Sequence, residues 1–380
     1  MSPSCGRSTP RVATDGRRIP GGAYSPQLDG LRAVAVVAVA YSHWLPAWQF
    51  GVPFGAGVHL FFVLSGFLIT RILLTLRAAP DRGAAIARFY ARRVLRLFPA
   101  FYLVLGLAWL TDVPLVRDTW AWHATYLSNV RIASEAQWLG HVSHFWSLAV
   151  EEQFYLVWPW LVIVTPARWL GAIVGGAVLL GPLVRLAAAG QGLSEAFWAL
   201  VPGGSADSLG VGAWLALDAW RYDVASLPSA SASASASPIV GRRGLVAAAG
   251  VAWLALAAAE VYGPLPAVVA VWRQLAQGLV FGWVVWRATQ GFHGAAGRLL
   301  AHPCTTYVGR VSYGIYLIHA FAPVAVFTAV RVLHAEALLP AAPLARTAIY
   351  AATTLGLATL MWLAVERPLL ALKARVPYAR

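Results

Sequence analysis

Ten long apolar runs constrain this chain more than any other feature of its sequence. Most of them are close to the roughly 20 residues that a helix needs to cross the hydrocarbon core of a bilayer. Only 12% of the 380 residues are charged, which is too few to cover a water-facing surface. The sequence therefore predicts an all-α, polytopic membrane helix bundle with about ten transmembrane helices. The predicted spans are Leu31–Phe50, Gly57–Leu76, Leu97–Leu110, Ser147–Thr165, Leu170–Ala189, Phe197–Ala219, Leu245–Tyr262, Leu265–Val285, Thr305–Val330 and Thr347–Leu372.

Positive charge is distributed unevenly between the two sides of this predicted bundle. With the amino terminus inside, 23 of the 29 lysine and arginine residues fall on the inner side, as the positive-inside rule describes. We therefore expect both termini to be cytoplasmic and the protein to lie in a bacterial cell (inner) membrane. Topology also explains most of the net charge of +14, so we expect no nucleic-acid partner. The outer set is Arg117, Arg131, Arg185, Arg273, Arg331 and Arg346.

The segments outside the predicted spans are short. Residues 1–27 are polar and arginine-containing and lack the pattern of a cleaved signal peptide, so we expect a disordered basic tail. Residues 28–372 form the membrane domain, and residues 373–380 form a cytoplasmic tail. Within the domain, the loop 221–243 contains the run SASASASASP, whose composition predicts a flexible linker. Any chemistry must therefore come from the membrane helices and their short loops.

The first predicted span carries two ionisable residues, Arg32 and His43. They are 11 residues apart, or about three helical turns, so they share one face roughly 16 Å apart along the axis. Ionisable groups at membrane depth usually face a bundle interior or a wet cavity. Taken alone, Arg32 could be a snorkelling interfacial arginine, and His43 could be a hydrogen-bonded histidine near the outer interface. The shared face favours a functional role for both.

Seven arginines fall between Arg71 and Arg96, on the inner side of the predicted topology. Part of this cluster is a topology signal. Arg93 and Arg96, however, are i and i+3 on a helix that enters the third span, so they are surface neighbours. Paired guanidinium groups suit a phosphate-bearing ligand. Coenzyme A is such a ligand, and its thioesters occur in the cytoplasm.

The segment HFWSLAVEEQFYLVWP places polar residues in the fourth span. Ser147, Glu151 and Tyr155 are four residues apart, so they stack on one helix face. Lipid-facing positions do not account for two adjacent carboxylates near membrane depth. We expect Glu151 to be an internal acid and Glu152 to face the outer headgroups. A carboxylate beside a histidine can orient the imidazole and fix its tautomer.

Further polar residues occur in later spans. Tyr313, Tyr316 and His319 fall roughly on one face of the ninth span, where hydrogen bonding between helices is the alternative to a functional role. Asp207 in the sixth span needs a partner, and an arginine is the obvious candidate. Glu366 closes the last span and should be interfacial.

Six segments together resemble the acyltransferase-3 family of integral membrane O-acyltransferases. The resemblance covers nearly the whole chain after about Gln27. It implies a ten-helix bundle that takes acyl groups from cytoplasmic acyl-CoA and modifies surface polysaccharides, lipid-linked sugars, peptidoglycan or macrolide antibiotics. The segments are QLDGLRAVAVVAVAYSHW, GVHLFFVLSGFLIT, RFYARRVLRLFPA, HFWSLAVEEQFYLVWP, ADSLGVGAWLA and VGRVSYGIYLIH.

The resemblance also implies the site residues. The arginine and histidine of the family's first helix match Arg32 and His43, and its basic RxxR motif matches Arg93 and Arg96. We expect His43, Arg32 and Glu151 to be catalytic and the two α-helical neighbours Arg93 and Arg96 to bind the donor. Where many members have an arginine shortly before the matched aspartate, this chain has Ser205. The family's WSL-x-x-E motif matches Trp146, Ser147, Leu148 and Glu151, and its final tyrosine and histidine match Tyr313 and His319. Other possible site residues are Ser147, Tyr155, Asp207, Tyr313 and His319.

The functional prediction is a membrane O-acyltransferase. It would move an acyl group, by default acetyl, from acyl-CoA as co-substrate to a hydroxyl of a glycan, glycolipid or antibiotic sugar, with no tightly bound cofactor or metal. A serine nucleophile at Ser65 or Ser147 lacks a Gly-x-Ser-x-Gly elbow, and the two cysteines, Cys5 and Cys304, suggest no zinc site or disulfide framework. The alternative is a transporter or flippase of a glycan or lipid, although the chain shows no inverted repeat.

Overall fold

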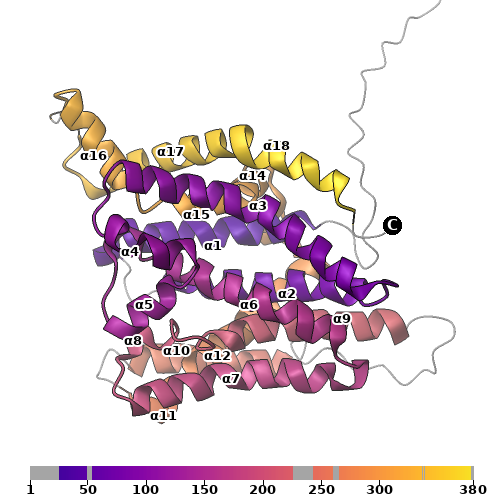
Figure 1. The fold of residues 1–380 in the computed structure, drawn as a ribbon. Coiled ribbons are helices and arrows are strands. Elements are labelled where there is room, and N and C mark those ends of the chain that lie inside the picture. Colours follow the sequence, from indigo (N-terminus) through magenta and orange to yellow (C-terminus); the bar gives the residue numbers. More distant parts are fainter. Residues whose placement is uncertain are drawn as a thin grey trace, which may run out of the picture.

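All regular secondary structure in the described part of this chain is helical. The long helices run side by side between the two ends of one bundle (Figure 1), which confirms the all-α prediction for these residues. The structure is a computed structural model that describes residues 25–48, 54–225, 243–259, 265–335, 337 and 339–377.

Each of the ten predicted apolar runs overlaps a helix or a group of consecutive helices. The longer helices are α1 Pro26–Trp44, α2 Gly57–Leu76, α3 Arg82–Leu110, α6 Phe145–Val164, α7 Leu170–Gly190, α9 Ala206–Ala225, α10 Arg243–Ala259, α12 Arg273–Gln290 and α17 Pro343–Met361. The shorter helices are α4 Val116–Ala124, α5 Ser128–Glu135, α8 Glu195–Trp198, α11 Ala267–Ala270, α13 Gly294–Ala301, α14 Pro303–Arg310, α15 Ser312–Ile318, α16 Ala322–Val332 and α18 Arg367–Ala371.

Five helices of the described residues are long and apolar enough to cross a membrane, and a sixth span results if α15 and α16 count as one. The chain is therefore a multi-pass membrane protein. The remaining predicted spans coincide with α1, α6 and α9, which carry ionisable side chains at their centres or ends, and with α10, which is shorter. A count of ten crossings stays a prediction.

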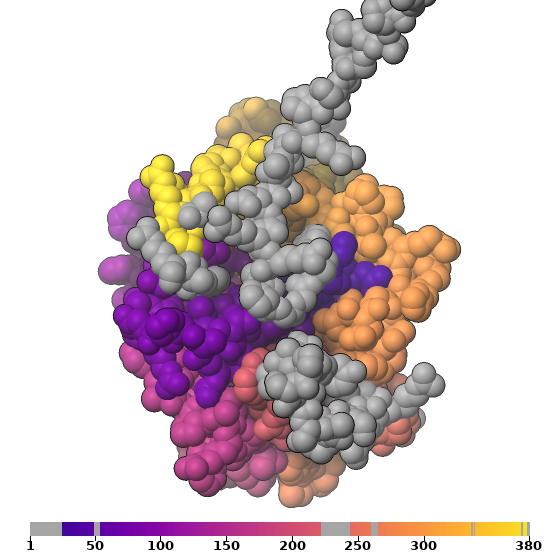
Figure 2. All heavy atoms as spheres, turned by 90° about the vertical axis from the view of Figure 1, so that its right-hand side faces the viewer, coloured from indigo at the N-terminus to yellow at the C-terminus, as the bar shows by residue number. Residues whose placement is uncertain are grey.

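The two ends of the described chain lie at the same end of the bundle, which we call the terminal end (Figure 1). Figure 2 looks onto this end, where the indigo start of α1 lies near the purple α2–α3 region and the yellow carboxy-terminal segment. Arg92 on α3 donates hydrogen bonds to the carbonyl oxygens of Lys373 (2.9 Å) and Val376 (2.7 Å). The carboxy-terminal segment is thus held against the start of α3. That this end is cytoplasmic stays a prediction.

The first helix differs from its prediction at both ends. It begins at Pro26 rather than Leu31. Proline is favoured at the first helical position, because the N–H that it lacks would have no partner within the helix there. The helix ends at Trp44, because Pro46 disfavours helical geometry at Leu45. The last residues of the predicted tail therefore belong to the bundle, where Gln27 Nε2 donates to the carbonyl oxygen of Phe292 (3.1 Å).

The predicted loop 221–243 is also shorter than expected, since α9 continues through Ala225. Most of that loop, and residues 1–24 of the predicted tail, lie outside the described residues.

Glycines bring α2 and α9 into close contact near the centre of the bundle. A Cβ added at Gly66 would lie 2.0 Å from the carbonyl oxygen of Leu209, and one at Gly212 would lie 2.1 Å from that of Val63. Small residues at such positions let membrane helices approach backbone to backbone. This contact holds α2, which carries part of the site, rigidly in place.

The predicted ninth span, Thr305–Val330, is not one helix. It is divided into α14, α15 and α16, and α16 turns by 61° from α15. The break leaves His319 at the end of α15, and Pro323 lies in the first turn of α16, where its missing N–H costs no hydrogen bond. As a result α16 leaves the bundle at the end opposite the termini, beside α17 (Figure 1).

Candidate active site

An internal cavity of about 220 Å³ lies among α1, α2, α3, α6 and α15. Regular helices place its polar residues, because positions three, four or seven residues apart share a face. Seven of the ten predicted site residues line this one cavity. The polar lining residues are Arg32, Ser65, Arg93, Arg96, Ser147, Glu151, Tyr155, Ser312, Tyr313 and Tyr316.

Three guanidinium groups give this cavity a positive character. Arg93 lies over the ring of Tyr155, 3.7 Å from its centroid, a cation–π contact that fixes the guanidinium. Arg32 is hydrogen-bonded to Asp29, one turn away on α1. Arg96 is exposed, although it lines the cavity, so it lies at the mouth. Clustered guanidinium forks of this kind suit a polyanionic ligand.

Two adjacent carboxylates of α6 lie inside the bundle. Glu151 Oε1 accepts a hydrogen bond from Ser65 Oγ at 2.8 Å. Glu152 was expected to face the outer headgroups, and this is wrong: its side chain is only 16% exposed, and its Oε1 lies 4.0 Å from Arg93 Nη2. The guanidinium of Arg93 on α3 thus provides the positive partner that an internal carboxylate needs.

Glu366 is a further internal acid, and its predicted interfacial position is wrong. The residue is 5% exposed and ends a π-helical turn, Trp362–Glu366. Gly314 makes room for it, because a Cβ there would lie 3.3 Å from Glu366 Oε1. Arg96 is the charged side chain that interacts electrostatically with this carboxylate. Because the π-turn inserts an extra residue, ordinary helical spacing could not reveal this position.

Three histidines gather near the end of the bundle opposite the termini. His43 Nδ1 lies 3.4 Å from His319 Nε2, and the ring centroids of His144 and His319 are 4.9 Å apart. His144 and His319 are buried, whereas His43 is exposed at the end of α1. No set of three His, Cys, Asp or Glu side chains in the described ranges could hold a metal ion. His144 was not predicted, since its partners come from helices distant in sequence.

Hydrogen bonds define which nitrogen of His43 is free. Its Nδ1 lies 2.9 Å from the carbonyl oxygen of Val39, which can only accept, so Nδ1 carries the proton. His319 Nδ1 likewise lies 2.7 Å from the carbonyl oxygen of Tyr316. His319 Nε2, 3.4 Å away, can then be the second and longer acceptor of the same His43 Nδ1–H, and His43 Nε2 keeps its lone pair. That nitrogen is available to take a proton from a reacting group.

Ser147 and Tyr316 connect the cavity with the histidines. Both line the cavity, and their hydroxyl oxygens lie 2.5 Å apart. Tyr316 Oη donates to the backbone carbonyl oxygen of His144 at 3.0 Å. We call these two residues the hydroxyl pair; it forms the part of the cavity wall that is adjacent to the histidine group. The polar residues of the structure thus form two neighbouring clusters, the arginine-lined cavity and the histidine group His43, His144 and His319, and not a single site.

A carboxylate beside a histidine can orient its ring, but no contact between Glu151 and His43 is among the interactions of the described residues. Glu151 is bonded to Ser65, while His43 contacts Val39 and His319. The reason is distance along α1, because His43 lies at the far end of the helix from the part that lines the cavity.

Asp207 lies in neither the cavity lining nor the histidine group. It is paired with an arginine, as predicted. Arg185 Nη2 on α7 lies 2.6 Å from Asp207 Oδ2, and both side chains are at most 3% exposed. Arg185 also donates to the carbonyl oxygens of Gly204 and Val271, and Gln274 donates to Asp207 Oδ1 at 3.0 Å. The partner thus comes from another helix rather than from the vicinity of Ser205, and the pair crosslinks three segments.

The described residues form a polytopic bundle whose arginine-lined internal cavity lies beside clustered histidines, an arrangement that suits an enzyme that joins an acyl donor to a hydroxyl acceptor. The acyltransferase domain family, acyltransferase 3, matches residues 25–363. The chain belongs to this family.

Individual relatives agree with this assignment over part of their length. The chain is 39% identical over 162 residues to the peptidoglycan O-acetyltransferase OatA of Listeria monocytogenes, a match that covers 37% of this chain and 24% of that protein. It is 40% identical over 158 residues to YrhL of Bacillus subtilis, with the same coverage of 37% and 24%. The match thus spans about a quarter of the length of these curated relatives. No solved structure matches the chain.

Proposed function

We propose that this protein transfers an acyl group, in the first instance acetyl, from cytoplasmic acyl-CoA to a hydroxyl of a cell-envelope glycan. The observation that supports the proposal is the juxtaposition of the arginine-lined cavity with the histidine group. The similarity to a peptidoglycan O-acetyltransferase supports both the acetyl group and a glycan acceptor.

The donor would enter from the terminal end of the bundle. Coenzyme A is a polyanion, and Arg96 and Arg93 present two guanidinium forks from successive turns of α3. Aliphatic side chains of α2 line the same cavity and suit the uncharged pantetheine arm; they are Leu68, Ile69 and Ile72. Arg32 lies about 16 Å from His43 along α1, so we assign it to the donor rather than to the reacting carbonyl.

The transfer itself would use His43 as general base. Its Nε2 takes the proton of the acceptor hydroxyl while the hydroxyl oxygen attacks the thioester carbonyl carbon. The tetrahedral intermediate then breaks its C–S bond, and the departing thiolate takes the proton back from the imidazolium. The products are an ester and free coenzyme A. His319, which contacts His43 Nδ1, would keep the ring oriented.

The test is a labelled-donor assay on the purified full chain. With [14C]acetyl-CoA and a soluble saccharide, the proposal predicts label in an alkali-labile ester and one free coenzyme A per ester formed. A transporter or flippase, the alternative function, would release no coenzyme A when the saccharide is added. That result would reject the proposed function.

Replacing Arg96 by glutamine should weaken donor binding selectively. A hydrogen bond to a charged group contributes about 1.5–3 kcal/mol, so we expect the KM for acetyl-CoA to rise roughly 10- to 100-fold. Arg82→Gln is the matched control, since Arg82 is an exposed arginine on the same helix that does not line the cavity. Equal KM values in the two variants would contradict the assignment of Arg96.

Lys373 should make donor binding depend on pH. Burial, and then the charges of Arg96, Arg92 and Arg93, lower the pKa of Lys373 to about 7. The amine is therefore positive below that pH and loses its charge as the pH rises through it. We expect the KM for acetyl-CoA to rise through the same range. Lys373→Arg, which stays charged, should show a flat profile, and an unchanged profile in that variant would exclude Lys373.

A further inference from the structure

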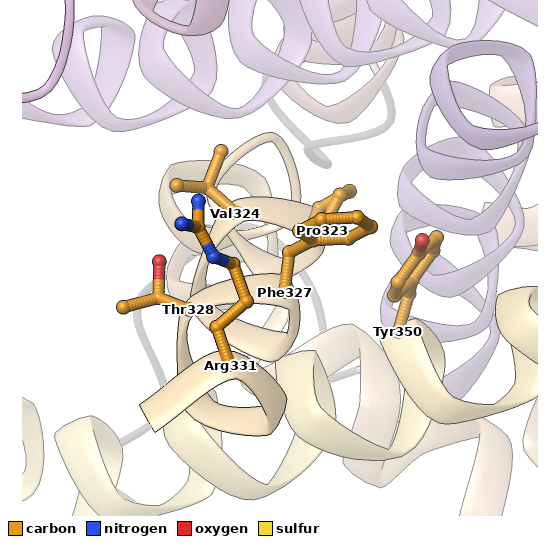
Figure 3. A pocket seen from close by; sticks show the side chains of 6 residues that line it. All are labelled: Pro323, Val324, Phe327, Thr328, Arg331 and Tyr350. Atoms are coloured by element: carbon orange, nitrogen blue, oxygen red, sulfur yellow. The ribbon is translucent and has the colours of Figure 1, made fainter. Parts of the chain in front are cut away.

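We infer that a groove between α16 and α17 binds the acceptor, and that it selects a carboxylate-bearing sugar. This inference rests on the proposed function and goes beyond it by naming an acceptor site and its ligand class. The groove has a volume of about 350 Å³, within the range of small-molecule sites. Its lining residues, shown in Figure 3, are Pro323, Val324, Phe327, Thr328, Arg331 and Tyr350.

The groove follows α16 away from the histidine group. Helix α16 begins three residues after His319, and the lining positions 323, 327 and 331 recur every four residues on one face. Arg331 therefore lies about 12 Å from Pro323 along the helix axis. One end of the groove adjoins the site, and the other end carries a positive charge.

Tyr350 connects the opposite wall of the groove to the site. Its ring centroid lies 6.3 Å from that of Trp44. Trp44 follows His43 in sequence, and its Nε1 donates to the carbonyl oxygen of His319 at 2.9 Å. A molecule in the groove would thus lie within reach of the exposed His43 ring.

The lining suits a sugar better than a lipid tail. In Figure 3 the rings of Phe327 and Tyr350 face the space between the two helices. Such rings offer flat apolar surface, and tyrosine adds a hydroxyl for hydrogen bonding. Thr328 supplies a second hydroxyl. A hydrocarbon chain would use neither the hydroxyls nor the guanidinium of Arg331.

Arg331 is distinctive among the six arginines assigned to the outer side. Within the described residues, the other five have acidic or carbonyl partners: Asp112 for Arg117, Glu135 for Arg131, Asp207 for Arg185, Glu195 for Arg273 and the carbonyl of Pro340 for Arg346. The guanidinium of Arg331 is exposed in the groove and forms no such contact in this part of the chain. It is therefore available to an anionic ligand.

The number of cations favours a carboxylate over a diphosphate. The donor cavity, which would hold several phosphate charges, presents three guanidinium groups. The groove presents one. One planar guanidinium matches one carboxylate with two parallel hydrogen bonds, so a uronic acid or another sugar acid is the ligand class that fits.

The test compares two acceptors that differ by one charge: methyl β-glucuronide and its methyl ester. We expect the full-length protein to acetylate the acid with the higher kcat/KM, and Arg331→Gln to reduce the acid-to-ester ratio about tenfold. Arg117→Gln, an outer arginine away from the groove, should keep the ratio. Phe327→Ala should raise the KM for both acceptors while leaving the ratio unchanged, since it removes packing but no charge.

The outcomes separate this inference from the function on which it rests. If the wild-type protein acetylates no saccharide, the proposed function fails. If it acetylates both sugars and Arg331→Gln keeps the wild-type ratio, the groove assignment is wrong. If Arg331→Gln slows acetylation of N-acetylglucosamine 1-phosphate but not acetylation of the glucuronide, the proposal that the groove selects carboxylate-bearing sugars is rejected.

Discussion

His43→Ala is expected to lower kcat/KM for acyl transfer by about 10²–10⁴-fold, the usual contribution of a positioned general base. The expectation follows from the bonding of the ring, in which Nδ1 faces the carbonyl oxygen of Val39 and Nε2 keeps its lone pair. Because His43 is exposed at the end of α1, its loss should leave the thermal unfolding temperature nearly unchanged. The measurement is initial-rate release of coenzyme A in the presence of a saccharide.

A matched histidine controls for surface effects of this change. His141 is also exposed and lies in the turn Gly140–Val142 that precedes α6. His141→Ala should retain wild-type turnover. Wild-type turnover in the His43→Ala variant would contradict the proposed role of His43 as the general base.

Arg185→Leu should have the largest effect on stability. It would leave Asp207 buried and unpaired, a change that typically costs about 3–5 kcal/mol. We expect a large fall in the unfolding temperature in detergent. The double variant Arg185→Leu, Asp207→Leu should recover much of the loss, because a buried ion pair can often be replaced by apolar side chains of similar volume.

A second arginine pair provides the control for this experiment. Arg273 Nη2 lies 2.6 Å from Glu195 Oε1, but both side chains are about one-third exposed. Such pairs contribute about 0–1 kcal/mol, so Arg273→Gln should change the unfolding temperature little. If Arg185→Leu kept wild-type stability but lost acyl transfer, Asp207 would have to be assigned to the active site instead.

The sequence predicted the features that depend on regular helical spacing. The second span has the predicted bounds, Gly57–Leu76, because its apolar run carries no competing start or stop signal. Ser147, Glu151 and Tyr155 line one cavity as their four-residue spacing requires. The i, i+3 pair of arginines on α3 reaches the same cavity for the same reason.

The sequence could not predict features that depend on irregular backbone or on distant partners. The break after α15 sets the position of His319 relative to His43, and the π-helical turn directs Glu366 inward. Glu152 is paired by Arg93 of α3, and although an arginine was expected for Asp207, its identity as Arg185 of α7 was not. No spacing within one helix encodes such pairs, since they arise only when the helices pack.

The number of crossings was difficult to predict for a related reason. The interior charges that mark the site also lower the apolar character of the helices that carry them. Helices α1 and α6 are therefore among the predicted spans that are not long and apolar enough to count as clear crossings, although they contribute Arg32 and Glu151 to the cavity. In this chain, the residues proposed to be functional make their own spans harder to recognise.

The short contact between Ser147 and Tyr316 also bears on how the bilayer stays sealed. Under the proposed function, the donor cavity and the histidine group must exchange an acyl group without letting protons or ions pass between them. These two hydroxyls, joined to each other and through Tyr316 to the His144 carbonyl, form the wall between the cavity and the histidine group. They would also keep a waiting thioester away from outside water, so that donor is not lost to hydrolysis when no acceptor is bound.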